Sequence, residues 1–501
     1  MASSTTSSDN IQKVVTETVT AINDDKSFSS TSTSFSGPLE LTKEDTKHLK
    51  RYYRKCDYRI TLYLGIAYAF DYISREAISA ARVANLIETL HLKPFEFNIA
   101  LALFFVGHLL FQVFSNIILK KTKPSWWMSF LIVGTGAVSM STAASQNHIG
   151  LYMCRLALGV IEAGIPAGAL FIMFSYYPRN ELGKRIGFFY GFASISNVIS
   201  GPINAGITKI HSSTIQSWRI IFLLLGGLMC LWGLLGLLFL RDYPQTASFL
   251  SAQEKRVIEK VMRAQGNRAA SIRFSKKQLI DALTDGKIWS CCVIGLCGHI
   301  LFNAGALLGP VMLSSYGFSQ EMSNGLNAIP NVFGFLLLAF SGTIVNRIGS
   351  TGFFLAGVES VSLVGFILAL AVPYRAAQII GLFIFTIFTS PGIALPAAWV
   401  SSNLAGTTKP VIASALISAV GSSGGGITAL IYRDQDKPRY FLGNSFSVGC
   451  CVIAIVLALF QTWYLKKENR RRDINPKDIS HFTEQEVIDL CDRHPDFRYR
   501  V

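Results

Sequence analysis

Apolar runs of membrane-spanning length recur along this chain and limit the folds open to it. An α-helix needs about 20 mainly apolar residues to cross a bilayer. Only 15% of the residues are charged, against about 25% in soluble domains, so an ordinary soluble enzyme is excluded. We identify twelve such runs, at residues 60–81, 97–119, 125–145, 149–177, 186–208, 220–240, 288–314, 323–345, 351–372, 376–404, 411–432 and 443–465.

The polar connection at 241–287 is much longer than the others and divides these runs six and six. We therefore predict an all-α membrane protein whose twelve transmembrane helices form two six-helix bundles, at 60–240 and 288–465, joined by a central cytoplasmic loop. The remaining segments are predicted to be a disordered, Ser/Thr-rich cytoplasmic tail (1–40), a cytoplasmic lead-in (41–59) and a cytoplasmic C-terminal tail (466–501).

The net charge of +15 is distributed between the apolar runs. Lys and Arg concentrate in the connections after even-numbered runs, above all at 241–287, which predicts that both termini are cytoplasmic. The excess charge is therefore assigned to membrane topology, and a nucleic-acid partner is not expected. Most cysteines lie within apolar runs, and the cluster Cys291, Cys292 and Cys297 lacks paired ligand spacing, so neither a disulfide framework nor a metal site is expected.

Ionisable residues inside membrane helices are costly, so they usually face a cavity or a partner and mark function. Within the twelve predicted segments they are Asp71, Arg75, Glu76, His108, Arg155, Glu162, His299 and Glu359.

In the fourth segment, Arg155 and Glu162 are seven residues apart and share one helix face. Gly159, Gly164 and Gly168 lie between or beside them and leave room for a neighbouring helix or a solute. We predict that Arg155 binds a substrate carboxylate and that Glu162 exchanges a proton. The alternative is a structural ion pair between helices.

Segments one, two and seven supply the next candidates. Asp71 and Arg75 are spaced i, i+4 and can neutralise each other, yet a guanidinium grips carboxylates in a two-pronged geometry, so Arg75 is a second candidate for the anion contact. His108 and His299 are candidate proton relays. Each histidine could equally be a neutral residue of the helix core.

The tenth segment contains Pro391, Gly392 and Pro396, which predict an interrupted helix that lines a cavity. Trp399 and Asn403 follow directly and are candidate substrate-binding residues. Close helix packing is the alternative.

Several strings resemble a known family. The loop GTIVNRIG at 342–349 resembles the Gly-x-x-x-Asp-Arg-x-Gly signature of major facilitator transporters. Longer strings are similar to the allantoate permease branch of that superfamily, the fungal anion:cation symporters: FNIALALFFVGHLLFQVFSNIILKK at 97–121, RLALGVIEAGIPAG at 155–168, WVSSNLAGTTKPVIASALI at 399–417 and IYRDQDKPRYFLG at 431–443. The similarity runs in order from about residue 50 to the terminal FRYRV.

This resemblance implies a proton-coupled symporter that imports a small organic anion, a carboxylate nutrient or vitamin such as an allantoate- or nicotinate-like compound. It implies no bound cofactor, a monomer in the lipid bilayer and a fungal plasma-membrane location. Arg75 matches the Arg of the family's first helix, and Arg155 and Glu162 fall on its fourth-helix motif. Two alternatives remain: a drug:proton antiporter, suggested by Gly201-Pro202, and a nutrient receptor that does not transport. No enzyme motif is present at a helix boundary, so an enzyme is not expected.

Overall fold

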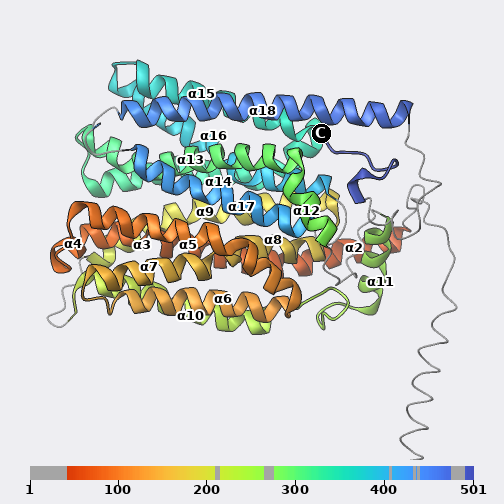
Figure 1. Ribbon diagram of the computed structural model, residues 1–501, viewed down its shortest axis with the longest axis horizontal. Helices are drawn as coiled ribbons and strands as arrows, with labels where there is room; N and C mark the ends of the chain where they lie inside the picture. The colour runs from red at the N-terminus through yellow and green to blue at the C-terminus, as the bar shows by residue number, and fades with distance from the viewer. Residues whose placement is uncertain are drawn as a thin grey trace, which may run out of the picture. The chain divides into compact units, whose positions relative to one another are not determined.

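The computed structural model describes residues 42–208, 215–264, 276–404, 409–432, 436, 440–475 and 491–501. Every regular element in these parts of the chain is a helix (Figure 1). The predicted disordered tail at 1–40 lies outside the described residues.

All twelve predicted membrane segments are helical, close to the predicted positions. The first six are α3 (Leu62–Val83), α5 (Pro94–Lys121), α6 (Pro124–Thr142), α7 (His148–Glu162) continued by α8 (Gly164–Tyr176), α9 (Arg179–Thr208) and α10 (Ser217–Phe239). The second six are α13 (Gly286–Ser315), α14 (Gln320–Ile348), α15 (Thr351–Ala371), α16 (Arg375–Asn403), α17 (Lys409–Ile431) and α18 (Phe441–Ile474).

Ten spans among the described residues are long and apolar enough to cross a membrane. The two segments that fall short of this standard are α3 and α6. Three charged residues, Asp71, Arg75 and Glu76, lie close together on α3 and lower its hydropathy. This first segment crosses only because the surrounding helices shield those charges from lipid.

Helix packing divides the molecule into two six-helix bundles. In the N-terminal bundle α6 packs on α10, α5 on α7 and α3 on α9, whereas in the C-terminal bundle α13 packs on α16 and α17, and α15 on α16 and α18. The bundles meet where α9 packs against α14 and α5 against α17. An amide hydrogen bond of 3.2 Å from Asn197 to Asn331 joins the first of these pairs.

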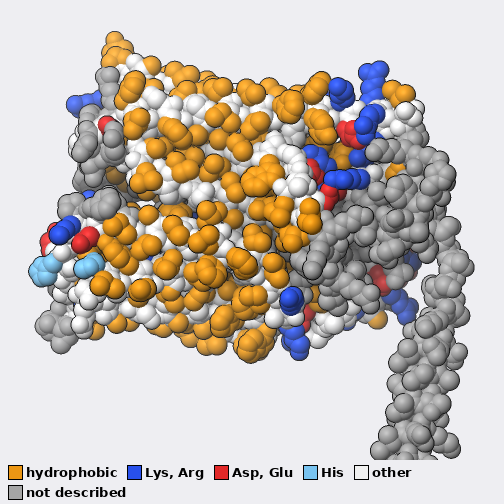
Figure 2. Space-filling model, in the orientation of Figure 1, with side chains coloured by type: hydrophobic (Ala, Val, Ile, Leu, Met, Phe, Trp, Pro, Cys, Tyr) orange, Lys and Arg blue, Asp and Glu red, His pale blue; other side chains and the backbone are white. Residues whose placement is uncertain are grey.

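On the face shown in Figure 2, apolar and charged side chains occupy separate zones, as expected for a protein that spans a bilayer. Figure 2 shows hydrophobic side chains covering the middle of the helices, while Lys, Arg, Asp and Glu gather at the two ends. Large apolar residues that stay exposed include Phe114 on α5, Leu238 on α10 and Phe333 on α14. Lipid is the solvent in which such a surface is stable.

The structure interrupts a different membrane segment from the one that the sequence predicts. The expected interruption of the tenth segment is wrong, because α16 continues through Pro391 and Pro396; neighbouring helices make proline tolerable inside membrane helices. The fourth segment breaks instead, between Glu162 and Gly164. Pro166 has no N–H to donate to the carbonyl of Glu162, four residues earlier.

The segments outside the bundles contain more structure than the sequence predicts. The lead-in forms α2 (Lys43–Cys56), which continues through a π-helical turn (Asp57–Thr61) into α3. The central loop contains α11 (Ala252–Ala264) and α12 (Lys276–Thr284). In the C-terminal tail α18 extends to Ile474, and Cys491–Arg493 forms a 3-10 turn. A short helix, α4 (Leu86–Thr89), follows α3.

Gly159 permits the close approach of α7 to α5. A Cβ at this position would lie 2.1 Å from the backbone oxygen of Phe104. We expect Gly159→Ala to force the two helices apart at about 1–3 kcal/mol, the usual range for overpacking, and to lower the melting temperature of the purified protein. Gly357→Ala on α15 is the matched control, because no atom lies within 4 Å of its Cβ position. Equal melting temperatures for the two variants would contradict this account.

Candidate functional site

A buried ion-pair network joins α3 to the end of α7. The Arg75 guanidinium donates from Nε and Nη2 to Oε1 of Glu162, at 2.9 and 2.6 Å. The same Nη2 lies 3.5 Å from Oδ2 of Asp71, one helical turn earlier. The carboxylate side chains of Asp71 and Glu162 are fully buried. One cation thus serves two carboxylates, so the predicted neutralisation of Arg75 by Asp71 is only part of the arrangement.

Two aromatic rings complete the surroundings of Arg75. Its guanidinium carbon lies 4.8 Å from the ring centre of Tyr72 and 5.1 Å from that of Phe104 on α5. Such contacts stabilise a cation where water is scarce. The sequence prediction missed both residues. The position of Tyr72, three residues before Arg75 and hence on the same helix face, is the signal that could have identified it.

Arg155 lies beside this network with much of its hydrogen-bonding capacity unused. It is 2% exposed, and its Nη1 donates to the backbone oxygen of Arg75 at 3.4 Å. Its Nε and Nη2 atoms are buried and have no hydrogen-bond partner among the described residues, and Oε2 of Glu162 is in the same condition. A buried guanidinium whose N–H groups have no acceptor destabilises the fold unless a bound group accepts hydrogen bonds from them. The arrangement is therefore suited to bind an oxygen anion.

Arg155 and Glu162 both lie on α7, before the break in the fourth segment. Arg155 lies in the middle of α7, and Glu162 is its last residue. The predicted pair on one face is present, but Glu162 bonds to Arg75 on α3 rather than to Arg155. The interhelical ion pair that the sequence offered as an alternative is present, but its cation is Arg75, and the substrate and proton roles of Arg155 and Glu162 remain predictions. Glu162 is an interhelical ion-pair partner, and Arg155 is left free of any carboxylate in the described structure.

The glycines of this segment serve helix packing. A Cβ at Gly164 would lie 2.0 Å from Oγ of Ser115 on α5, and one at Gly168 would lie 2.5 Å from the sulfur of Met128 on α6. With Gly159 they allow close contact with α5 and α6. The glycine-lined surface that the sequence offered as an approach for a solute is thus occupied by neighbouring helices.

His108 and His299 are both buried, on α5 and α13. Nδ1 of His299 lies 2.8 Å from the backbone oxygen of Gly295, whereas both ring nitrogens of His108 lack a partner among the described residues. Both rings lie within electrostatic range of Arg75. Phe302, three residues after His299, contacts the ring of Tyr72 at a centroid distance of 6.2 Å, so the C-terminal bundle reaches the charged network here.

Trp399 and Asn403 are not part of this network. The indole N–H of Trp399 and the amide of Asn403 donate to the backbone oxygen of Arg500, at 3.1 and 2.8 Å. Both side chains, which the sequence predicts to contact substrate, therefore bind the last residues of the chain. They do so because α16 continues past its prolines to Asn403, and the C-terminal residues pack against this end of the helix.

Two further carboxyl groups also lie outside the network. Glu76 is partly exposed and forms no direct ion pair among the described residues, although it lies within electrostatic range of Arg75. Glu359 on α15 is fully buried, and its Oε1 is 2.7 Å from the place where a Cβ of Gly392 would stand. Both Glu359 oxygens lack a hydrogen-bond partner in the described structure, and we have no physical account of this residue.

Two six-helix bundles that meet beside a buried charged network are the architecture of a multi-pass membrane transport protein. The sequence model of the family described as Major Facilitator Superfamily matches residues 64–429. The chain belongs to this superfamily.

Related proteins agree with this assignment. The chain is 27% identical over 448 residues to "Uncharacterized transporter C1683.12" of Schizosaccharomyces pombe, covering 88% of this chain and 91% of the relative. It is 28% identical over 426 residues to "MFS-type transporter efuF" of Hormonema carpetanum, covering 84% and 86% of the two chains. The solved structure of the proton:xylose symporter XylE matches with a TM-score of 0.65 at 13% identity, over 81% of this chain and 95% of that one; this similarity concerns the fold alone.

Proposed function

We propose that this transporter is a proton-coupled symporter that imports a small organic anion, and that Arg155 binds the anion. The observation that carries the proposal is the buried guanidinium of Arg155, two of whose nitrogen atoms have no partner among the described residues. A carboxylate could accept from both nitrogens in the two-pronged geometry that guanidinium favours.

Charge balance supports coupling to a proton. Asp71, Arg75, Arg155 and Glu162 carry two negative and two positive charges when all are ionised, and each is largely buried. An arriving anion would leave this water-poor site with a net negative charge, which is unfavourable. Uptake of one proton by Asp71 or Glu162 restores neutrality. The anion and the proton are then bound together, as symport requires.

The substrate class rests on the sequence. The strings that resemble the allantoate permease branch include RLALGVIEAGIPAG, which contains both Arg155 and Glu162. We therefore propose a carboxylate nutrient or vitamin, such as an allantoate- or nicotinate-like compound, taken up across the plasma membrane by a monomer.

The test is uptake into cells that express the chain, with a panel of radiolabelled monocarboxylates, with and without a protonophore. Symport predicts accumulation of at least one acid, abolished by the protonophore. Accumulation that resists the protonophore would exclude proton coupling. Export of cationic drugs in place of acid uptake would favour an antiporter, and specific binding without uptake would indicate a receptor.

The proposed topology leads to a separate expected result. With both termini cytoplasmic, epitope tags fused at Met1 and Val501 should resist external protease in intact cells and be cleaved after permeabilisation. The physical reason is the concentration of Lys and Arg in the central connection, which the positive-inside rule assigns to the cytoplasm. Cleavage of either tag in intact cells would contradict the topology.

A further inference from the structure

The C-terminal segment Cys491–Val501 docks on one end of the C-terminal bundle through many specific contacts. The Arg472 guanidinium on α18 donates through Nη1 to the backbone oxygens of Asp492, His494 and Phe497, at 3.0, 3.2 and 2.8 Å. Asn469 on α18 exchanges two hydrogen bonds with the backbone of Tyr499, and Thr351 N–H donates to the oxygen of Val501 at 2.7 Å. These hydrogen bonds satisfy the backbone of the turn at 491–496 and of the irregular stretch that follows it.

The side chain of Asp492 anchors the segment in a buried charge cluster. It accepts from Lys409 on α17 at 2.9 Å and from Lys287 on α13 at 2.7 Å. Lys409 also contacts Asp281 of α12 and Asp285, each at 2.7 Å. Asp492 and Lys409 are fully buried. Burial raises the pKa of the Asp492 carboxyl, but the two lysines outweigh it and hold the pKa below its ordinary value.

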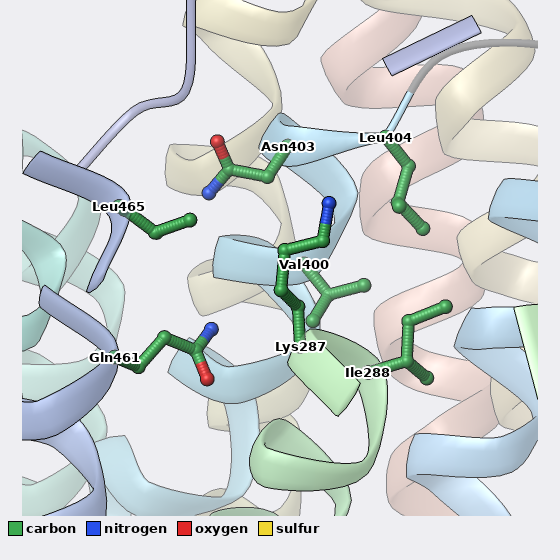
Figure 3. Close-up of a pocket in the computed structure, with 7 residues that line it drawn as sticks. All are labelled: Lys287, Ile288, Val400, Asn403, Leu404, Gln461 and Leu465. Carbon is green, nitrogen blue, oxygen red and sulfur yellow. The ribbon is translucent and has the colours of Figure 1, made fainter. Parts of the chain in front are cut away.

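A small pocket lies beside this docked segment. Figure 3 shows its lining residues, which come from the beginning of α13, the end of α16 and α18: Lys287, Ile288, Val400, Asn403, Leu404, Gln461 and Leu465. Two of them, Lys287 and Asn403, bind the segment directly. Oε1 of Gln461 is buried there without a partner among the described residues.

The N-terminal bundle contains a related cluster that needs no tail. Asp57, just before α3, accepts from Arg185 on α9 at 2.7 Å, and Glu181 on the same helix accepts from Arg185 at 2.6 Å. Asp285, just before α13, and Lys409 on α17 occupy the corresponding positions of the second bundle. The extra carboxylate is supplied there by Asp492. Lys409 thus keeps Asp281 and Asp285 as partners outside the C-terminal segment, and the segment adds a third carboxylate, whereas the N-terminal cluster takes both of its acids from its own helices.

This difference extends to the connection between the bundles. Helix α11 is held to α2 of the N-terminal bundle by an ion pair of 2.9 Å between Lys55 and Glu254. Helix α12 is held to the C-terminal bundle by Asp281, which pairs with Lys409 and with Arg493 of the C-terminal segment. Helix α11 is therefore attached to the N-terminal bundle and helix α12 to the C-terminal bundle. Among the described residues, the C-terminal segment contributes an ion pair only to the attachment of α12.

We propose that Cys491–Val501 is a detachable latch, and that its docking through Asp492 fixes α12 to the C-terminal bundle. When the latch is docked, α12 moves with that bundle. When it is released, Lys287 and Arg472 lose their partners in the segment. Helix α12 then loses the ion pair of Asp281 with Arg493 but keeps its contacts with Lys409 and with Trp289 of α13. Transporters of this fold work by moving one bundle against the other. The latch therefore determines whether α12, in the connection between the bundles, stays attached to the C-terminal bundle during this movement.

Hydrogen exchange of the full-length purified protein tests the latch. Asp492→Asn should raise amide exchange about tenfold or more in 491–501 and in α12, because the buried Lys409 and the partly exposed Lys287 each lose a charged partner. Exchange in α11 should stay unchanged. The matched control is Asp496→Asn in the same segment, whose carboxylate is mostly exposed and should change neither region. If α12 were unaffected, or if α11 exchanged as much faster as α12, the proposal would be overturned.

A peptide distinguishes a detachable latch from a fixed part of the fold. A synthetic peptide of residues 491–501, added to the Asp492→Asn protein, should restore protection of α12, whereas a scrambled peptide should not. Rescue by both peptides, or by neither, would overturn the proposal. If Asp492→Asn is not recovered folded, Tyr499→Phe decides the point, because it removes only the hydroxyl that contacts Lys287 and Arg472. Several-fold faster exchange in 491–501 and α12 is expected, and wild-type exchange would contradict the latch.

Discussion

Replacing Arg155 by alanine is expected to weaken binding of the transported anion by about 30-fold to several thousand-fold. Losing one member of a buried charge pair costs about 2–5 kcal/mol, and each 1.4 kcal/mol is a factor of ten. Arg155→Lys keeps the charge but loses the planar, two-pronged donor geometry, so it should still weaken binding by about tenfold or more. Concentration dependence of radiolabelled uptake, with the acid identified in the panel, measures both effects.

Arg219 provides the matched control for these two variants. It is an arginine near the start of α10 that donates to the backbone oxygens of Ala143 and Ser145, at 2.7 and 3.3 Å. Arg219→Lys should lower the melting temperature and leave the affinity for the anion unchanged. If Arg155→Lys behaved in this way, Arg155 would have a structural role, and Arg75 would become the better candidate for the anion contact.

Neutralising a carboxylate of the network should uncouple transport from the proton gradient. Glu162→Gln leaves Asp71, Arg75 and Arg155 with one net positive charge, so an anion alone restores neutrality and no proton is required. We expect this variant to exchange labelled for unlabelled solute at a measurable rate and to lose accumulation against a gradient, about tenfold or more. The same charge argument predicts uncoupling by Asp71→Asn, because both carboxylates share Arg75.

Glu76→Gln is the control for neutralisation, because Glu76 lies next to Arg75 in the sequence yet has no ion pair among the described residues. It should retain accumulation. Accumulation that survives in both Glu162→Gln and Asp71→Asn would move the proton to another group, of which His108 and His299 are the first candidates. Measuring counterflow and accumulation on the same vesicles separates loss of coupling from loss of binding.

The membrane helices could be predicted because their main determinant is local. Each needs only a run of about 20 apolar residues, and all twelve were found. Helix continuity could not be predicted in this way. Pro391 and Pro396 lie in a helix that remains unbroken, whereas Pro166 coincides with a break. A proline removes the same backbone bond in each case, and the packing of neighbouring helices decides whether the helix continues.

The site was only partly predictable for a similar reason. Charge in an apolar run identified Arg75, Arg155 and Glu162, since that signal is visible within a single segment. Their partners depend on which helices are neighbours: Glu162 pairs across to α3, and Phe104 approaches Arg75 from α5. The contacts of Trp399 and Asn403 with Arg500 could not be predicted, because nothing near these two residues in sequence shows that the last residues of the chain fold back onto α16.

The break after Glu162 divides the fourth membrane segment into two short rods joined at Ala163, with different surroundings. The rod that carries Arg155 ends at the carboxylate, and the following rod, α8, is buried along nearly all of its length. Ala163 itself keeps helical backbone angles, with φ −51° and ψ −32°, so the two rods remain parts of one membrane segment. A solute bound at Arg155 would therefore act on the rod that also carries the Glu162–Arg75 ion pair, whereas the second rod is held within the bundle.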